Sequence, residues 1–123
     1  MRAIIILSVL LLTGCPLLHI GHIENNSNKE ITIMNPWHRE QLWHIEPGLN
    51  GEVIWNKQCL VIAEGEIERY FALNNVPDEI YQVESRFSSN IHIYGKLQSG
   101  NLILQSKSGS SFIISPSKEC PNA

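Results

Sequence analysis

Short apolar runs separated by turn residues constrain the fold of this chain more than any other feature of its sequence. Glycine, proline, asparagine and serine interrupt the apolar pattern at regular intervals, as they do between the strands of small β proteins. No stretch of residues 29–123 has the length and 3.6-residue period of a long amphipathic helix. The runs occupy residues 30–33, 41–45, 52–55, 59–63, 66–73, 90–97, 102–105 and 112–114.

This pattern predicts an all-β domain, a small antiparallel β-sandwich or partly open barrel of about eight strands. Ile31 and Ile33 alternate with polar residues and should share one face of a strand. The continuous apolar run at residues 59–63 is typical of a fully buried strand. Residues 90–97 predict another strand, in which Gly95 marks a candidate bulge. Residues 98–101 (Gln-Ser-Gly-Asn) predict a hairpin that leads into the strand at residues 102–105.

Residues 79–85 admit two interpretations. Ile80, Val83 and Phe87 lie at near-helical spacing, and residues 77–79 (Pro-Asp-Glu) suit a helix start. Tyr81 and Val83 instead alternate as they would in a strand, and we predict a strand here.

The first fifteen residues carry a targeting pattern. One cation, Arg2, precedes the apolar run of residues 3–11, which is too short to span a bilayer as a mature helix. The run ends in Leu12-Thr13-Gly14-Cys15, which resembles the lipobox of bacterial lipoproteins. The resemblance implies that residues 1–14 are a cleaved signal peptide and that Cys15 receives a diacylglycerol and an N-linked fatty acid such as palmitate. The alternative is an ordinary signal peptide with a chance cysteine.

A lipidated Cys15 would hold the domain at a membrane, because each buried methylene contributes roughly 0.8 kcal/mol and about two acyl chains suffice for stable anchoring. In lipoproteins of enteric type, an aspartate after the cysteine marks retention in the inner membrane, and this chain has Pro16 there. We therefore expect an outer-membrane protein that faces the periplasm, with the inner membrane as the alternative. The mixed segment that follows predicts a tether at residues 15–28 and a β-sandwich domain at residues 29–123.

Size and charge limit the function classes. Removal of 14 residues from 123 leaves 109, the size of one domain. Without Arg2, eight basic residues oppose twelve acidic ones, which gives a net charge of −4. No basic cluster is present in the sequence, so nothing predicts nucleic-acid binding.

Two of the three cysteines remain once Cys15 is assigned to lipid. Because the periplasm is oxidising, we predict a disulfide between Cys59 and Cys120. It would close a loop of roughly 60 residues and contribute on the order of 4 kcal/mol in the chain-entropy treatment. The alternative is two reduced cysteines, with Cys59 buried in its apolar run.

All three tryptophans lie within residues 37–55, and two of them belong to the repeated dipeptides Trp37-His38 and Trp43-His44. A strand-turn-strand at residues 37–44 would gather these four residues into one exposed patch suited to docking a protein. They are therefore candidate partner-binding residues. The alternative places the tryptophans in the core of the sandwich.

The sequence contains few residues arranged for metal binding or catalysis. Five histidines are present, but the close pair His19 and His22 lies in the predicted tether, and no cysteine remains as a ligand, so we predict neither a metal site nor a cofactor. Asp78 is the only aspartate, and no nucleophile elbow or phosphate-binding glycine loop occurs. We predict that the protein is not an enzyme.

The segment Thr13-Gly14-Cys15-Pro16, followed by a cysteine-stapled, strand-rich domain, is similar to small enterobacterial lipoproteins proposed as immunity proteins against secreted antibacterial effectors. The similarity carries over no site residue. It implies a non-catalytic protein-binding module at the envelope. The competing hypothesis is a structural or assembly lipoprotein, or a superinfection-exclusion factor that occludes a receptor.

Overall fold

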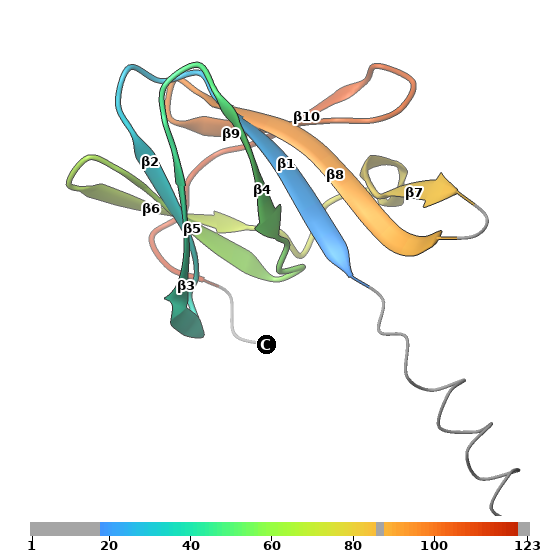
Figure 1. Ribbon diagram of the computed structural model, residues 1–123, viewed down its shortest axis with the longest axis horizontal. Helices are drawn as coiled ribbons and strands as arrows, with labels where there is room; N and C mark the ends of the chain where they lie inside the picture. The colour runs from blue at the N-terminus through green and yellow to red at the C-terminus, as the bar shows by residue number, and fades with distance from the viewer. Residues whose placement is uncertain (1–17, 86–87, 121–123) are drawn as a thin grey trace, which may run out of the picture.

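Two β-sheets packed face to face form the domain in the computed structural model, which describes residues 18–85 and 88–120 (Figure 1). The predicted signal peptide and Cys15 lie outside these residues. The strands are β1 (His19–Asn25), β2 (Ile31–Asn35), β3 (His38–Ile45), β4 (Asn50–Ile54), β5 (Cys59–Glu64), β6 (Ile67–Ala72), β7 (Gln82–Ser85), β8 (Ser88–Gln98), β9 (Asn101–Gln105) and β10 (Ser111–Ile114).

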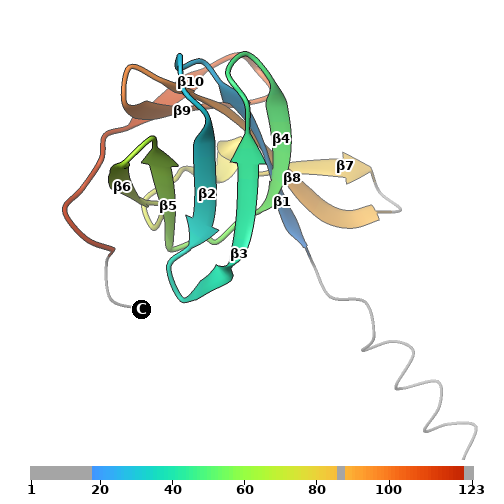
Figure 2. The same cartoon turned by 60° about the vertical axis from the view of Figure 1, so that its left-hand side comes forward.

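The larger sheet has the order β10-β9-β8-β1-β4, with β7 paired to β8, and the smaller sheet has the order β3-β2-β5-β6 (Figure 2). The predicted all-β sandwich is thus confirmed. The described residues contain ten strands where the sequence predicted about eight. All pairs are antiparallel except that of β1 with β8, so the larger sheet is mixed.

The prediction of a tether at residues 15–28 is wrong for residues 19–25, which form β1. This strand lies between β8 and β4, with registers that include Gly21 against Ile93 and Gly21 against Val53. Its inward positions carry a glycine and a polar residue beside Ile23, so the apolar alternation that marks other strands is missing. Gly21 is required there, because a Cβ at this position would lie 2.7 Å from Cε3 of Trp55.

The predicted hairpin between residues 97 and 102 is confirmed. Ser99 and Gly100 have φ angles of 53° and 79°, as a two-residue turn with both central residues left-handed requires. The predicted bulge at Gly95 is wrong, since the pairing of β8 runs unbroken through this residue on both sides. A Cβ at Gly95 would lie 2.7 Å from Cδ2 of Leu104, so close strand packing explains this glycine.

Both interpretations of residues 79–85 are partly realised. A single 3₁₀ turn, η1 (Asp78–Ile80), follows Pro77 and buries Ile80. The chain then extends into β7, which pairs with β8. The predicted strand is correct from Gln82 onward, and the helix-start signal accounts for the turn before it.

The core lies between the two sheets and is built from the inward rows of both. Phe71 and Leu60 contribute from the smaller sheet, and Ile93 and Leu104 contribute from the larger one, all fully buried. Trp55, just after β4, packs in the same core.

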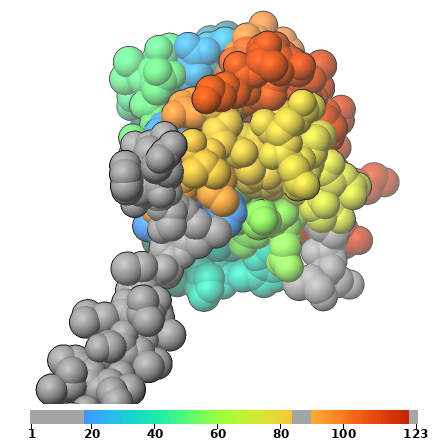
Figure 3. All heavy atoms as spheres, turned by 90° about the vertical axis from the view of Figure 1, so that its right-hand side faces the viewer, coloured from blue at the N-terminus to red at the C-terminus, as the bar shows by residue number. Residues whose placement is uncertain are grey.

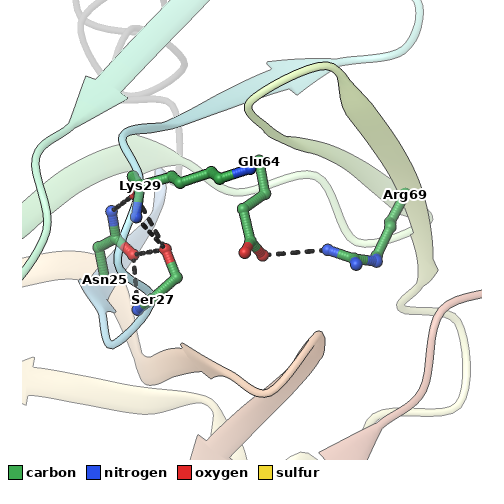
Figure 4. A network of polar contacts seen from close by, with 5 residues as sticks. All are labelled: Asn25, Ser27, Lys29, Glu64 and Arg69. Carbon is green, nitrogen blue, oxygen red and sulfur yellow. Dashed lines mark hydrogen bonds and ion pairs between the residues drawn. The ribbon is translucent and has the colours of Figure 1, made fainter.

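A polar network around the buried Asn25 closes one end of the sandwich (Figure 4). The side chain of Asn25, at the end of β1, donates hydrogen bonds to the carbonyl oxygens of Lys29 and Ile45 at 2.8 and 2.9 Å. Its Oδ1 accepts from the backbone N–H and the hydroxyl of Ser27. Nearby, Arg69 donates to Glu64 at 3.0 Å. Asn25 thereby fixes the β1–β2 loop over the core.

The predicted disulfide between Cys59 and Cys120 is confirmed, with the two Cα atoms 5.7 Å apart. The segment that leads to Cys120 runs beside the edge strand β6, where the backbone N–H of Ser117 donates to the carbonyl oxygen of Tyr70 at 2.8 Å. The disulfide therefore fastens the C-terminal segment to the smaller sheet.

Candidate functional site

Three aromatic side chains stand together on the outer face of the larger sheet. His22 comes from β1, and His92 and Tyr94 come from β8. Successive strand residues point to opposite faces, and Gly21, Ile23 and Ile93 point into the core, so these three side chains point outward. The parallel register places His22 opposite Tyr94. We call His22, His92, Tyr94 and the adjacent Glu52 of β4 the imidazole–tyrosine strip.

The two imidazoles share a hydrogen bond. Nε2 of His22 lies 2.7 Å from Nδ1 of His92, and the ring planes differ by 19°. One ring nitrogen must donate and the other must accept, so the pair holds one shared proton between the two strands. Tyr94 stacks on the His22 ring with a centroid distance of 4.6 Å and an interplanar angle of 10°.

A carboxylate approaches the strip from the neighbouring strand. Oε1 of Glu52 lies 3.8 Å from Nδ1 of His22, so His22 is contacted through both ring nitrogens. The next outward residues along β1 and β8, Glu24 and Lys96, face each other in register. The strip is therefore a row of rings with charged residues at its border.

Two open hollows flank Tyr94. One, of about 470 Å³, lies between β7 and Lys107 in the turn after β9, and the other, of about 340 Å³, lies over β1 and β8. Figure 3 shows the yellow segment that includes β7 beside the red-orange segment around β9 and β10. Nε2 of Gln82 donates to the carbonyl oxygen of Gln105 at 3.3 Å and bridges these segments. Tyr94 lines both hollows and is 42% exposed, so it forms the ridge between them.

The four candidate partner-binding residues do not form one patch. Residues 38–45 are a single strand, and the turn lies at residues 36–37, so the expected strand-turn-strand is absent. Trp43 points inward and packs against the core. His44 points outward, and its Nδ1 shares a hydrogen bond with the Thr32 hydroxyl at 2.9 Å. Trp37 is 46% exposed in the turn, and His38 is exposed beside it. Of the three tryptophans, Trp55 is a core residue, as the alternative proposed.

The imidazole–tyrosine strip could not be predicted from the sequence, because His22 lies in the segment predicted as a tether. Alternation of His92, Tyr94 and Lys96 with inward apolar residues is visible in the sequence of β8. The same alternation is not visible in the sequence of β1, because Gly21 and Asn25 occupy inward positions of that strand. Only the pairing of β1 with β8 brings His22 to Tyr94.

Another titratable group lies where β1 begins. Burial lowers the pKa of the His19 imidazole, and the positive charge of Lys57 lowers it further. The His19 ring meets the Tyr81 ring edge-on at 5.9 Å, and Nζ of Lys57 lies 5.1 Å from the centroid of the same ring. Burial also raises the pKa of the Tyr81 hydroxyl. A neutral imidazole and a protonated phenol are the favoured forms here.

Among the described residues, no group of three or more histidine, cysteine, aspartate or glutamate side chains is arranged to hold a metal ion. Within the same residues, no helix has the length and apolar character needed to cross a membrane. No protein family, no curated protein and no solved structure matches this chain. The residues of the site are therefore the basis for a functional proposal.

Proposed function

We propose that this chain is an envelope lipoprotein, anchored through Cys15, whose β-sandwich binds another protein without catalysing a reaction. The observation that carries the proposal is the position of Tyr94, an exposed aromatic ridge between two hollows with a hydrogen-bonded histidine pair beside it. Tyrosine is enriched at the centres of protein interfaces, where it supplies contact area at a low cost in side-chain entropy.

The shape of this face suits a protein better than a small molecule. Its hollows are open to solvent, and they lie side by side on β8, an eleven-residue strand that can span at most about 36 Å at roughly 3.3 Å per residue. A typical stable interface buries about 800 Å² on each partner, which needs a surface of this extent. Stacking on His22 also holds the Tyr94 ring in place before a partner arrives.

Charge supports one kind of partner. The proposed mature chain has a net charge of −4, which speeds capture of a basic protein. A secreted antibacterial effector would be such a partner, and the protein would then confer immunity. An outer-membrane protein as the partner would instead indicate an assembly or receptor-occluding role.

An affinity capture with residues 16–123, which include every described strand and the disulfide, tests the binding face. The bait is compared with its Tyr94→Ala variant and with Ile113→Ala, which removes another exposed side chain from the outer face of the same sheet. We expect one partner that is retained by the unaltered bait and by Ile113→Ala and lost with Tyr94→Ala. If every captured protein binds the three baits equally, the proposed binding face is wrong.

The anchor is tested separately in cells. Labelled palmitate should be incorporated into the full-length chain and not into its Cys15→Ala variant. A full-length chain that takes up no label while it accumulates in the envelope would contradict the lipid anchor, and it would leave the binding experiment unaffected.

A further inference from the structure

An apolar hollow lies at the place where the chain enters the sandwich. It has a volume of about 230 Å³ and sits beside the β1–β4 edge of the larger sheet. Leu18 and Ile54 line it and are 45% and 50% exposed. The other residues that line it are Ile20, Trp43, Glu52 and Val53. The surface of the hollow is mostly apolar, whereas polar and apolar surface are nearly balanced in the two hollows beside Tyr94.

Leu18, which lines the hollow, is close in sequence to the proposed lipid anchor Cys15. Leu18 is already part of the folded domain, since its carbonyl oxygen accepts a hydrogen bond from the Ile91 N–H at 2.8 Å. Cys15 is three residues earlier, and three residues span at most about 11 Å. A lipid attached to Cys15 therefore brings the bilayer surface to the hollow.

Polarity changes along the outer face in the direction that a membrane would require. Outward residues of β4, β1 and β8 stand in cross-strand rows that can be followed away from Leu18. The first row contains Ile54, Ile20 and His92. The second row contains Glu52, His22 and Tyr94, and the third contains Asn50, Glu24 and Lys96. The two strands nearest the hollow are thus apolar in the first row and charged or polar in the later ones.

Trp43 gives the hollow an interfacial character. It comes from β3 of the smaller sheet, is half-buried and packs against the core while it lines the hollow. Tryptophan is enriched where membranes meet water, because its ring is apolar and its N–H is polar. Glu52, the ionisable residue in the lining, belongs to the second row, where its carboxylate approaches His22.

We propose that this hollow is the membrane-contacting surface of the anchored domain, with Leu18, Ile20 and Ile54 set among the lipid headgroups and upper acyl chains. The inference rests on the proposed anchor at Cys15. It also orients the molecule, since β1 then runs away from the bilayer. His22, Tyr94 and Glu52 of the imidazole–tyrosine strip stand one row above Ile20 and Ile54 and stay open to a partner.

Chemical coupling provides a test that does not depend on lipidation in cells. With Cys59 and Cys120 in their disulfide, Cys15 is the single thiol of residues 15–123 and reacts with a maleimide-headgroup lipid in phosphatidylethanolamine–phosphatidylglycerol vesicles. Tryptophan emission is compared between vesicles with plain and with brominated acyl chains. The Trp37→Phe background leaves Trp43 and the buried Trp55 as reporters.

We expect brominated lipids to reduce the emission of the coupled domain, because Trp43 approaches the acyl chains. In the Ile54→Glu variant, most of the lost tryptophan emission should return. Ile113→Glu is the matched control, since Ile113 is 60% exposed on the outer face of the same sheet but lies on β10, at its opposite edge, and this variant should be quenched like the parent. Melting curves in solution verify that both variants fold.

Equal emission in plain and brominated vesicles would overturn the proposal. A loss of emission that depends on the surface density of the coupled protein and not on bromine would also overturn it, because a second copy of the chain would then cover the hollow. Neither result bears on palmitate labelling of Cys15, so failure of the contact surface and failure of the anchor remain distinguishable.

Discussion

Asn25 donates a hydrogen bond from Nδ2 to the carbonyl oxygen of Ile45 at 2.9 Å, and this bond joins the end of β1 in the larger sheet to the end of β3 in the smaller one. The same amide donates to the Lys29 carbonyl, and its oxygen accepts from Ser27. Asn25 is fully buried and its bond to Ile45 is buried too, so the Ile45 carbonyl oxygen loses its donor inside the protein when this side chain is removed. A single residue thereby connects both sheets and the β1–β2 loop.

Asn25→Ala should lower the free energy of unfolding by about 2 kcal/mol, because it leaves the buried carbonyl oxygen of Ile45 without its donor, whereas the Lys29 carbonyl oxygen keeps the Ser27 hydroxyl. Urea unfolding of the oxidised domain measures this change. Asn26→Ala, at the exposed neighbouring position, should change stability by no more than about 0.5 kcal/mol. Similar losses in the two variants would show that the Asn25 network does not stabilise the fold.

The disulfide should stabilise the domain mainly through the loop it closes. The two cysteines are 61 residues apart, so the double variant Cys59→Ala/Cys120→Ala should lose about 4 kcal/mol in urea unfolding. Ser117→Ala should lose far less, because its backbone N–H still pairs with Tyr70. A double variant as stable as the parent would show that the C-terminal segment is held without the disulfide.

The sequence predicted those parts of the fold that local chemistry determines. Alternation revealed β2 and β8, the continuous apolar run revealed β5, and Ser99-Gly100 revealed the hairpin between β8 and β9. The pairing of Cys59 with Cys120 followed from counting cysteines in an oxidising compartment. Each of these signals lies within a few residues of the feature that it predicts, or depends on composition alone.

The candidate site was not predictable in the same way. His22 meets His92 seventy residues later in the chain, through a parallel pairing that no turn specifies. Inward positions of β1 hold Gly21, which makes room for Trp55, and Asn25, which serves the loop network. The packing of Trp55 and the hydrogen bonds of the β1–β2 loop thus removed the apolar pattern from β1, an inner strand of the larger sheet. The predicted patch of tryptophans and histidines at residues 37–44 is absent for a different reason. Successive residues of β3 point to opposite faces, so Trp43 and His44 cannot share one surface.

Gly95→Ala should destabilise the domain by about 2 kcal/mol, because the new methyl group would overpack a fixed backbone. Its Cβ would lie 2.9 Å from the carbonyl oxygen of Ile103, which is held in the β8–β9 pairing and has little freedom to move. Gln98→Ala, exposed at the end of the same strand, is the control and should stay within about 0.5 kcal/mol of the parent. Thermal and urea unfolding give the comparison, and equal stability of both variants would contradict close packing at Gly95.

Acidification should weaken the domain through His19. Burial, followed by the charge of Lys57, lowers the pKa of His19 in the folded state below its ordinary value of 6.5. At pH values under 6.5 the unfolded chain therefore binds a proton that the folded domain resists, so unfolding is favoured. The contribution of neutral His19 is fully present above pH 6.5 and is lost as the pH falls through the lowered pKa of the folded state.

His19→Gln should show a shallower loss of stability than the parent between neutral and acidic pH in urea unfolding. The loss of stability of Lys57→Met on acidification should lie between those of the parent and His19→Gln, because this variant removes the charge of Lys57 and leaves His19 buried. Parallel pH profiles for the parent and His19→Gln would show that His19 protonation is not linked to folding.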